Sequence, residues 1–118
     1  MGGKKSRDKG KRGELEFAAL CREHGFDCHR TAQYCGKTGQ AADVKGLPGI
    51  HAEVKRCETL KVWDFMLQAE RDSNPGEIPI VAWRRNNHRW LIIMEANDWF
   101  KLYSEYFGGV QNQEETSE

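Results

Sequence analysis

In residues 50–56, apolar and polar side chains alternate from Ile50 to Lys55, and this regularity limits the fold more than any other stretch of the chain. Successive side chains of a strand point to opposite faces, so the stretch predicts a strand whose two faces differ in chemistry. Its apolar face carries Ile50, Ala52 and Val54. Its polar face carries His51, Glu53 and Lys55.

The other patterns place this strand in a series of elements that fits one domain of 118 residues. Helical spacing predicts three helices, at about residues 11–24, 60–72 and 97–107. Four more strands are predicted: residues 26–31 by alternation, a short strand at 41–45, and two strands at 78–84 and 89–95 on either side of Asn86-Asn87. Gly25 is expected to end the first helix, Asn97 to cap the last, and Asn86-Asn87 to form a tight hairpin turn. This order predicts an α/β or α+β domain, a mixed central β-sheet flanked by helices.

The charges sum to zero but are unevenly distributed. The first twelve residues hold six basic side chains against Asp8, whereas residues 108–118 hold only acidic charges. We expect a disordered basic arm at 1–9, a folded domain at 10–107 and a disordered acidic tail at 108–118. Basic side chains that neutralise phosphates release counterions, so Lys9, Lys11 and Arg12 are candidate DNA contacts. A solvated terminus that only aids solubility is the alternative interpretation of the same charges.

The sequence predicts a cytoplasmic protein without a membrane partner. Its longest apolar run, residues 90–94, is too short to cross a bilayer, and no apolar stretch follows the basic N-terminus as in a secretory signal. The four cysteines form no C-x-x-C pair: Cys21, Cys28, Cys35 and Cys57. Buried thiols in a reducing compartment are the favoured interpretation. A metal site that joins Cys21 and Cys28 to His24 and His29 is the alternative.

Two carboxylates and one ammonium are expected to meet at one end of the sheet. Asp43 ends a short strand, and the Leu47-Pro48-Gly49 turn would return the chain so that Asp43 lies beside Glu53. Carboxylates this close repel each other unless a cation lies between them, and Mg²⁺ prefers such oxygen ligands. The backbone carbonyl of Val54 is a further candidate ligand, and Lys55 would stabilise developing negative charge. This set suits phosphodiester hydrolysis, although a Glu-x-Lys pair also occurs on solvent-facing strands without a function.

The same residues carry a resemblance. Asp43 and Glu53-Val54-Lys55 resemble the core motif of PD-(D/E)xK nucleases, and the chain is similar over about residues 9–95 to the archaeal-type Holliday-junction resolvases and their viral relatives. The matching residues are Lys9-Gly10-x-x-x-Glu14-x-Glu16, His24-Gly25-Phe26, Arg30-x-Ala32, Asp43-Val44 and Glu53-Val54-Lys55.

The resemblance implies a restriction-endonuclease-like nuclease domain and assigns roles to its residues. Glu14, Asp43 and Glu53, with the Val54 carbonyl, would bind Mg²⁺, for which Mn²⁺ can substitute; Glu14 would act directly or through water. Lys55 would be the catalytic lysine and Gln68 would support the site, although a glutamine on an amphipathic helix is more often plain surface. Arg30 would lie near the DNA backbone, with an exposed strand arginine as the alternative.

Two departures from the family pattern concern the motif and the loop that follows Arg30. Ala42 stands where the family often has a proline before the first aspartate, and Gln33-Tyr34 stand where the resolvases have Gly-Ser. Because the altered loop belongs to the junction-contacting surface in the family, nuclease chemistry is more firmly implied than junction selectivity.

The expected function is therefore a metal-dependent, structure-selective DNA endonuclease, a Holliday-junction resolvase of recombination and repair. Its partners would be a four-way DNA junction and a second copy, because two symmetric nicks require a twofold dimer. No small-molecule cofactor is expected, and the host would be prokaryotic, with a phage-encoded origin also open. The alternatives are a related nicking, flap or restriction-like nuclease and a DNA-binding module that does not cleave. Seven aromatic residues would form core or dimer contacts, or stack on unpaired bases: Trp63, Phe65, Trp83, Trp90, Trp99, Tyr103 and Tyr106.

Overall fold

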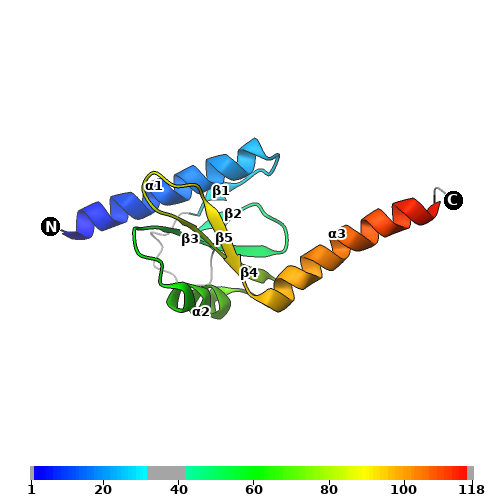
Figure 1. The fold of residues 1–118 in the computed structure, drawn as a ribbon. Coiled ribbons are helices and arrows are strands. Elements are labelled where there is room, and N and C mark those ends of the chain that lie inside the picture. Colours follow the sequence, from blue (N-terminus) through cyan, green and yellow to red (C-terminus); the bar gives the residue numbers. More distant parts are fainter. Residues whose placement is uncertain (1, 32–41, 117–118) are drawn as a thin grey trace.

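A five-stranded mixed sheet forms the centre of the protein (Figure 1). The computed structural model describes residues 2–31 and 42–116. Within them the elements follow the predicted order: α1 (Gly2–Glu23), β1 (His29–Arg30), β2 (Val44–Lys45), β3 (Ile50–Arg56), α2 (Val62–Asp72), β4 (Ile78–Arg84), β5 (Leu91–Met94) and α3 (Ala96–Thr116). The bounds of β3 and β4 agree with the sequence-based prediction residue for residue.

The strands are arranged in sequence order, β1-β2-β3-β4-β5, with β3 and β4 inside the sheet. β3 and β4 are parallel, because α2 returns the chain to the end of the sheet at which β3 begins. In this register Glu53 pairs with Val81. The other neighbours are antiparallel. A mixed sheet with helices around it confirms the predicted α+β fold.

The alternation in β3 divides the sheet into two different faces. One face packs on α1 through a cluster that includes Phe17, Ala18, Ala52 and Val54. The other face packs on α2 through Met66, Ala69, Val81 and Trp83. Each large side chain buried in these clusters stabilises the fold by about 1.5–3 kcal/mol. Because residues 51, 53 and 55 alternate with the α1-facing positions, they lie on the α2 side of the sheet.

Gly13 lets α1 approach the sheet closely. A Cβ atom at this position would lie 2.5 Å from the Cβ of Arg56 on β3, so a larger residue would push the helix away. The close approach places Glu14, the next residue of α1, near the end of β3.

The structure differs from the sequence-based expectations at the ends of the outer helices. α1 begins at Gly2 instead of Lys11, and α3 continues to Thr116 instead of Phe107. Residues expected in a disordered arm and tail are therefore helical, because Lys, Arg, Gln and Glu favour helices and a Gly108-Gly109 pair costs only about 2 kcal/mol. The domain bounds 10–107 remain a prediction.

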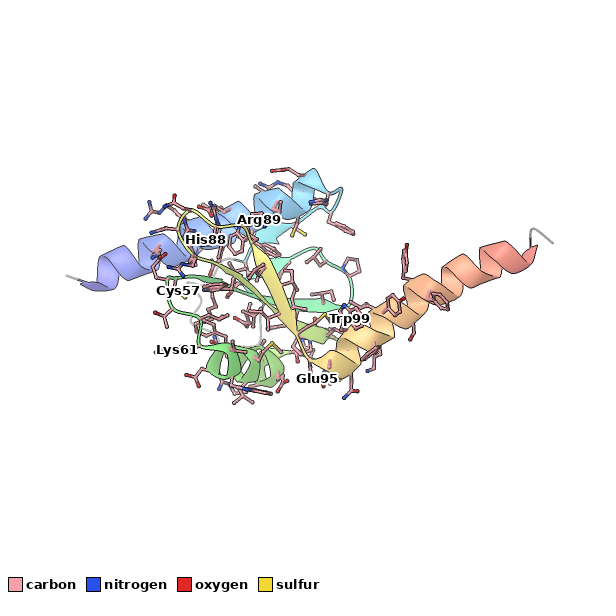
Figure 2. The ribbon with its side chains drawn as sticks, in the orientation of Figure 1. Cys57, Lys61, His88, Arg89, Glu95 and Trp99 are labelled. Carbon is pink, nitrogen blue, oxygen red and sulfur yellow. The ribbon has the colours of Figure 1, made fainter. Side chains whose placement is uncertain are left out.

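The cap of α3 and the preceding turn also differ. The carboxylate of Glu95 accepts the backbone N–H groups of Asn97 and Asp98 at 3.0 and 3.3 Å, so Glu95 caps the helix and Asn97 lies inside it (Figure 2). The turn at Asn86-Asn87 exists, with Asn87 at φ 63°, but β4 ends at Arg84 and β5 begins only at Leu91. The predicted tight hairpin is thus a longer connection.

β1 and β2 are shorter than predicted, two residues each. The N–H of Cys28 donates to the carbonyl of Phe26 at 2.8 Å, which bends the chain before β1 can form a longer ladder. The loop expected at 32–40, with Ala32, Gln33, Tyr34 and Cys35, lies outside the described residues. Among the helices that are described, none is long and apolar enough to cross a membrane.

Candidate active site

The polar face of β3 is buried rather than solvent-facing. His51 is 1% exposed and Glu53 is 2% exposed. A carboxyl group that deep in a protein costs stability unless hydrogen bonds or charges compensate it. The partners of these side chains therefore decide whether the face can carry chemistry.

Asp43 lies directly beside β3, as the turn at residues 47–49 predicts. Its Oδ2 accepts the backbone N–H of Val54 at 2.8 Å, and its own N–H donates to the carbonyl of Ala52 at 3.0 Å. The N–H and C=O groups of one strand residue point to the same neighbour. The Val54 carbonyl therefore lies on the Asp43 side of β3, where a ligand role would require it.

The carboxyl groups of Asp43 and Glu53 face each other closely enough to interact strongly. Burial, and after it the negative charge of Asp43 and a hydrogen bond with Asp43, raise the pKa of Glu53 to about 8, against the opposing effect of Lys55. Without a cation, Glu53 therefore retains a proton at neutral pH. A divalent cation between the two groups would remove this repulsion.

Lys55 is held by α2. Its Nζ donates to Oε1 of Gln68 at 2.8 Å and lies 5.1 Å from the centroid of the Phe65 ring, a cation–π distance. The structure thus brings the predicted lysine and glutamine together, and it adds Phe65 as the ring that covers the ammonium group.

Glu14 reaches the same edge from α1, and Arg30 holds it there. Nε of Arg30 donates to Oε1 of Glu14 at 2.7 Å. Burial and then the charge of Asp43 raise the pKa of Glu14, while Arg30 lowers it. Glu14 therefore lies within electrostatic reach of Asp43, but its carboxylate is already paired with the arginine that was expected to lie near DNA.

The oxygen donors at this edge fit a hard divalent cation. In the described part of the chain, no three His, Cys, Asp or Glu side chains are close enough to bind a metal alone. A cation would therefore depend on Asp43, Glu53, the Val54 carbonyl, water and substrate phosphate. This is the binding mode of Mg²⁺, which keeps several waters and uses one or two carboxylates together with phosphate oxygens.

The candidate DNA contacts on α1 are accessible. Lys11 and Arg12 are exposed, and Lys9 is half-buried near the carboxylate of Glu58, whose pKa is lowered first by the backbone N–H of Asn86 and less by the charge of Lys9. Two arginines near the β4–β5 connection are engaged within the chain instead. Arg84 donates to Glu16 at 2.9 Å, and Arg85 lies 3.7 Å from Glu58.

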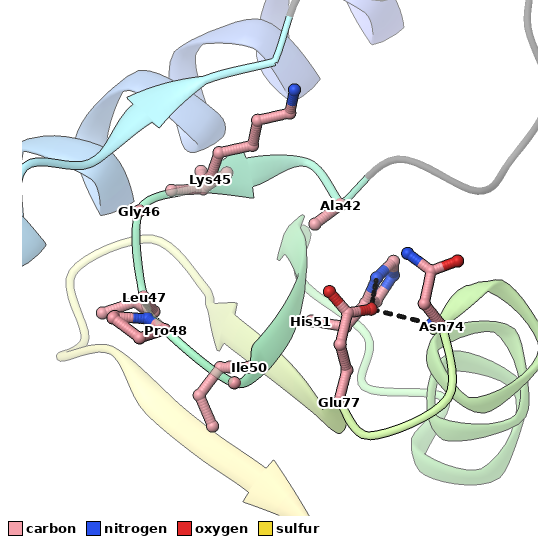
Figure 3. A pocket seen from close by; sticks show the side chains of 11 residues that line it. Ala42, Lys45, Gly46, Leu47, Pro48, Ile50, His51, Asn74 and Glu77 are labelled. Atoms are coloured by element: carbon pink, nitrogen blue, oxygen red, sulfur yellow. Dashed lines mark hydrogen bonds and ion pairs between the residues drawn. The ribbon is translucent and has the colours of Figure 1, made fainter.

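His51 borders the site, and its contact with Glu77 was not predicted from the sequence. Nε2 of His51 and Oε1 of Glu53 are hydrogen-bonded at 2.8 Å, and Nδ1 of His51 faces Glu77 at 3.6 Å. Glu77 is held by the backbone N–H of Asn74 at 2.7 Å (Figure 3). Sequence alternation placed His51 on the face of Glu53, but no local signal connects it to Glu77.

The thiols agree with the sequence-based interpretation where they are described. Cys21 and Cys28 are buried and Cys57 is partly buried, all as free thiols. Burial and the neighbouring Cys28 raise the pKa of Cys21 to about 11. The alternative metal site with His24 and His29 is wrong for this arrangement, since the described residues contain no metal-binding group of this kind. Cys35 lies outside the described residues.

Comparisons with known proteins place this site in a recognisable fold. No family model matches the sequence, and no curated protein matches it. Among solved structures, the fold of one resolvase matches the fold of this chain. It is that of Hjc, a Holliday junction resolvase from the archaeal hyperthermophile Archaeoglobus fulgidus, with a TM-score of 0.50 and 21% identity. The match covers 73% of this chain and 72% of that chain, and it shows that the two proteins share their fold.

Proposed function

We propose that this protein is a metal-dependent DNA endonuclease that cleaves four-way junctions as a homodimer. The observation that carries the proposal is the half-buried Asp43 against the buried Glu53, beside Lys55, where burial and the charge of Asp43 raise the pKa of Glu53 to about 8. Two carboxyl groups this close destabilise the fold when no cation is bound. A cation between them would remove that cost, so the pair favours cation binding. The fold shared with a resolvase supports DNA as the substrate.

The proposed reaction is hydrolysis of a phosphodiester. A water oxygen forms a bond to phosphorus, the bond to one sugar oxygen breaks, and a phosphate monoester and a hydroxyl remain. Mg²⁺, or Mn²⁺ in its place, would be held by Asp43, Glu53 and the Val54 carbonyl, with Glu14 nearby, and would supply Lewis-acid neutralisation of phosphate charge.

Lys55 supplies the second positive charge of the site. Its hydrogen bond to Gln68 and its position over Phe65 hold the ammonium group in one place before substrate arrives. A preorganised charge stabilises the negative charge that develops on phosphate without a further reorganisation cost. We assign Gln68 the role of positioning Lys55.

Lys9, Lys11 and Arg12 are proposed to bind the DNA backbone from α1. They lie on the helix that also carries Glu14, so phosphate contacts along α1 would orient the duplex relative to the site. Arg30 is proposed to act near DNA only when substrate or cation displaces its pairing with Glu14.

The second copy is proposed to bind the aromatic side of α3. This helix extends away from the sheet (Figure 1), and five of its aromatic residues are about half exposed or more. They are Trp99, Phe100, Tyr103, Tyr106 and Phe107. At about 150–250 Å² for each ring side chain, they expose roughly 500 Å² in total. Exposed Leu102 on the same helix enlarges this apolar area, and a standard interface buries roughly 800 Å² per partner.

The chemistry of α3 favours a second copy over DNA or a membrane. Trp99 and Tyr103 are stacked at 5.2 Å with 4° between their planes, which gives a flat apolar surface suited to an identical surface. The opposite side of the helix carries Asp98 and Glu105 against Lys101. Phosphate groups and anionic lipids would prefer a basic polar side.

The experiment that tests the substrate compares labelled four-way junction, flap and linear duplex with the same pure protein. We expect cleavage of the junction with Mg²⁺ or Mn²⁺, little cleavage of duplex at moderate salt, and none with a chelator. Equal cutting of junction and duplex would favour a nicking or restriction-like nuclease. Binding of the junction without cleavage of any substrate would favour a DNA-binding module and contradict the proposal.

A further inference from the structure

We propose that His51 is a positioning residue that fixes the carboxylate of Glu53 for cation binding, and that Glu77 orients the His51 ring. The inference rests on the proposed function, because it concerns the same cation site. It assigns roles to the side chains of His51 and Glu77 and to the backbone N–H of Asn74.

The burial of His51 requires an explanation. A polar ring at 1% exposure is costly unless its nitrogens have partners. Nε2 of His51 lies 2.8 Å from Oε1 of Glu53, and Nδ1 lies 3.6 Å from Oε1 of Glu77. Both ring nitrogens therefore face carboxylates, one on β3 and one just before β4.

The ring is fixed from both ends. Glu77 is itself held by the N–H of Asn74 at 2.7 Å, at the wall of an open pocket lined by residues 46–50 (Figure 3). The parallel register of β3 and β4 pairs His51 with Pro79, two residues beyond Glu77. The sheet itself thus sets the distance between Glu77 and His51.

His51 fixes the orientation of the Glu53 carboxylate. Because Oε1 is occupied by His51, the carboxylate loses rotational freedom and the other oxygen is left for a cation shared with Asp43. Hydrogen-bond partners behind metal ligands typically contribute about 10- to 100-fold to metal affinity. His51 would therefore act on cation affinity through Glu53, without contact to the cation or to DNA.

The test measures Mn²⁺ binding to the DNA-free protein by electron paramagnetic resonance, so that it does not depend on cleavage. His51→Leu removes the donor, His51→Asn places an amide too short to reach Glu53, and His51→Gln places an amide nitrogen near the position of Nε2. We expect about 10- to 100-fold weaker Mn²⁺ affinity for the Leu and Asn variants and near wild-type affinity for His51→Gln. His24→Leu, at an exposed position in the turn after α1, is the matched control.

If His51→Leu fails to fold, His51→Gln and His51→Asn still decide the test, since both side chains are polar and close in size to histidine. Equal Mn²⁺ affinity in His51→Asn and wild type would overturn the inference. An equally large loss in folded His51→Gln would overturn it as well, because only the restored donor separates positioning from general packing. Failure of the wild-type protein to bind Mn²⁺ would instead contradict the proposed function, and the inference would fall with it.

Discussion

Lys55 and Gln68 are joined by a hydrogen bond of 2.8 Å from the ammonium Nζ to the amide Oε1. The bond connects β3 to α2, so the helix that covers one face of the sheet also aims the lysine. A long flexible side chain is thereby held in one orientation before substrate binds. Such preorganisation separates a catalytic lysine from an ordinary surface lysine.

Substitution of either residue should therefore slow cleavage without loss of DNA binding. We expect Lys55→Met to lower the single-turnover rate by about 100- to 1000-fold, because it removes a charge that stabilises the transition state. Gln68→Leu should lower it by about 10- to 100-fold through misplacement of Lys55. Cleavage and gel-shift assays on one labelled junction measure both properties. Glu70→Gln, on the exposed side of α2, is the matched control, and a Gln68→Leu enzyme as fast as this control would remove Gln68 from the site.

The raised pKa of Glu53 predicts how stability depends on pH in metal-free protein. The folded state holds a proton on Glu53 up to about pH 8, whereas the unfolded chain releases it near its ordinary value of 4.5. Because the folded state then binds more protons, the free energy of unfolding falls as pH rises from about 4.5 to 8, by up to a few kcal/mol. Urea unfolding at several pH values measures this slope.

Glu53→Gln should flatten that slope, because an amide has no proton to release. Added Mg²⁺ should stabilise wild-type protein more at pH 8 than at pH 5, and Glu53→Gln much less at either pH. Identical slopes in wild type and Glu53→Gln would show that Glu53 is not the group that holds the proton.

The aromatic side of α3 predicts the oligomeric state. Tyr103→Ser removes the ring that stacks on both Trp99 and Phe107. We expect this variant to be monomeric at concentrations where wild type is dimeric, as measured by light scattering after size-exclusion chromatography. Lys101→Ser, on the opposite side of the same helix, should remain dimeric. A dimer that persists in Tyr103→Ser would place the interface elsewhere.

The thiols differ in predicted reactivity. Cys21 and Cys28 are buried, and the pKa of Cys21 is raised to about 11, so neither should react with a thiol reagent in the native state. Cys57 is partly exposed and should react. Thiol titration of a Cys35→Ser variant before and after unfolding counts these groups. Rapid native labelling of more than one thiol in that variant would contradict the packing of α1 on β1.

Local patterns predict the centre of this fold well and its outer parts less well. Alternation identified β3 at Ile50–Arg56, and β4 was predicted at Ile78–Arg84 as the strand before the Asn86-Asn87 turn. β1 and β2 were predicted too long, because a turn at Phe26 and the pairing with neighbouring strands decide where these short ladders end. The first residues of α1 and the last residues of α3 are helical because of their helix propensity. The sequence analysis expected disorder there because of the charge pattern.

The residues of the candidate site were predicted in part, and the contacts between distant elements were not. Spacing brought Asp43, Glu53 and Lys55 together, and a family resemblance added Glu14 and Gln68. The pairing of Glu14 with Arg30 across 16 positions was not predictable from spacing, and neither was the contact of His51 with Glu77. Both contacts join elements whose relative placement only the folded sheet establishes.

The most direct test of the central claim is single-turnover cleavage of a labelled four-way junction with Mg²⁺ by wild type, Asp43→Asn and Glu53→Gln. These two substitutions remove the carboxylates while they preserve shape, so junction binding should remain. The proposed site predicts cleavage by wild type and no detectable cleavage by either variant. Cleavage by Asp43→Asn or Glu53→Gln at the wild-type rate would contradict it.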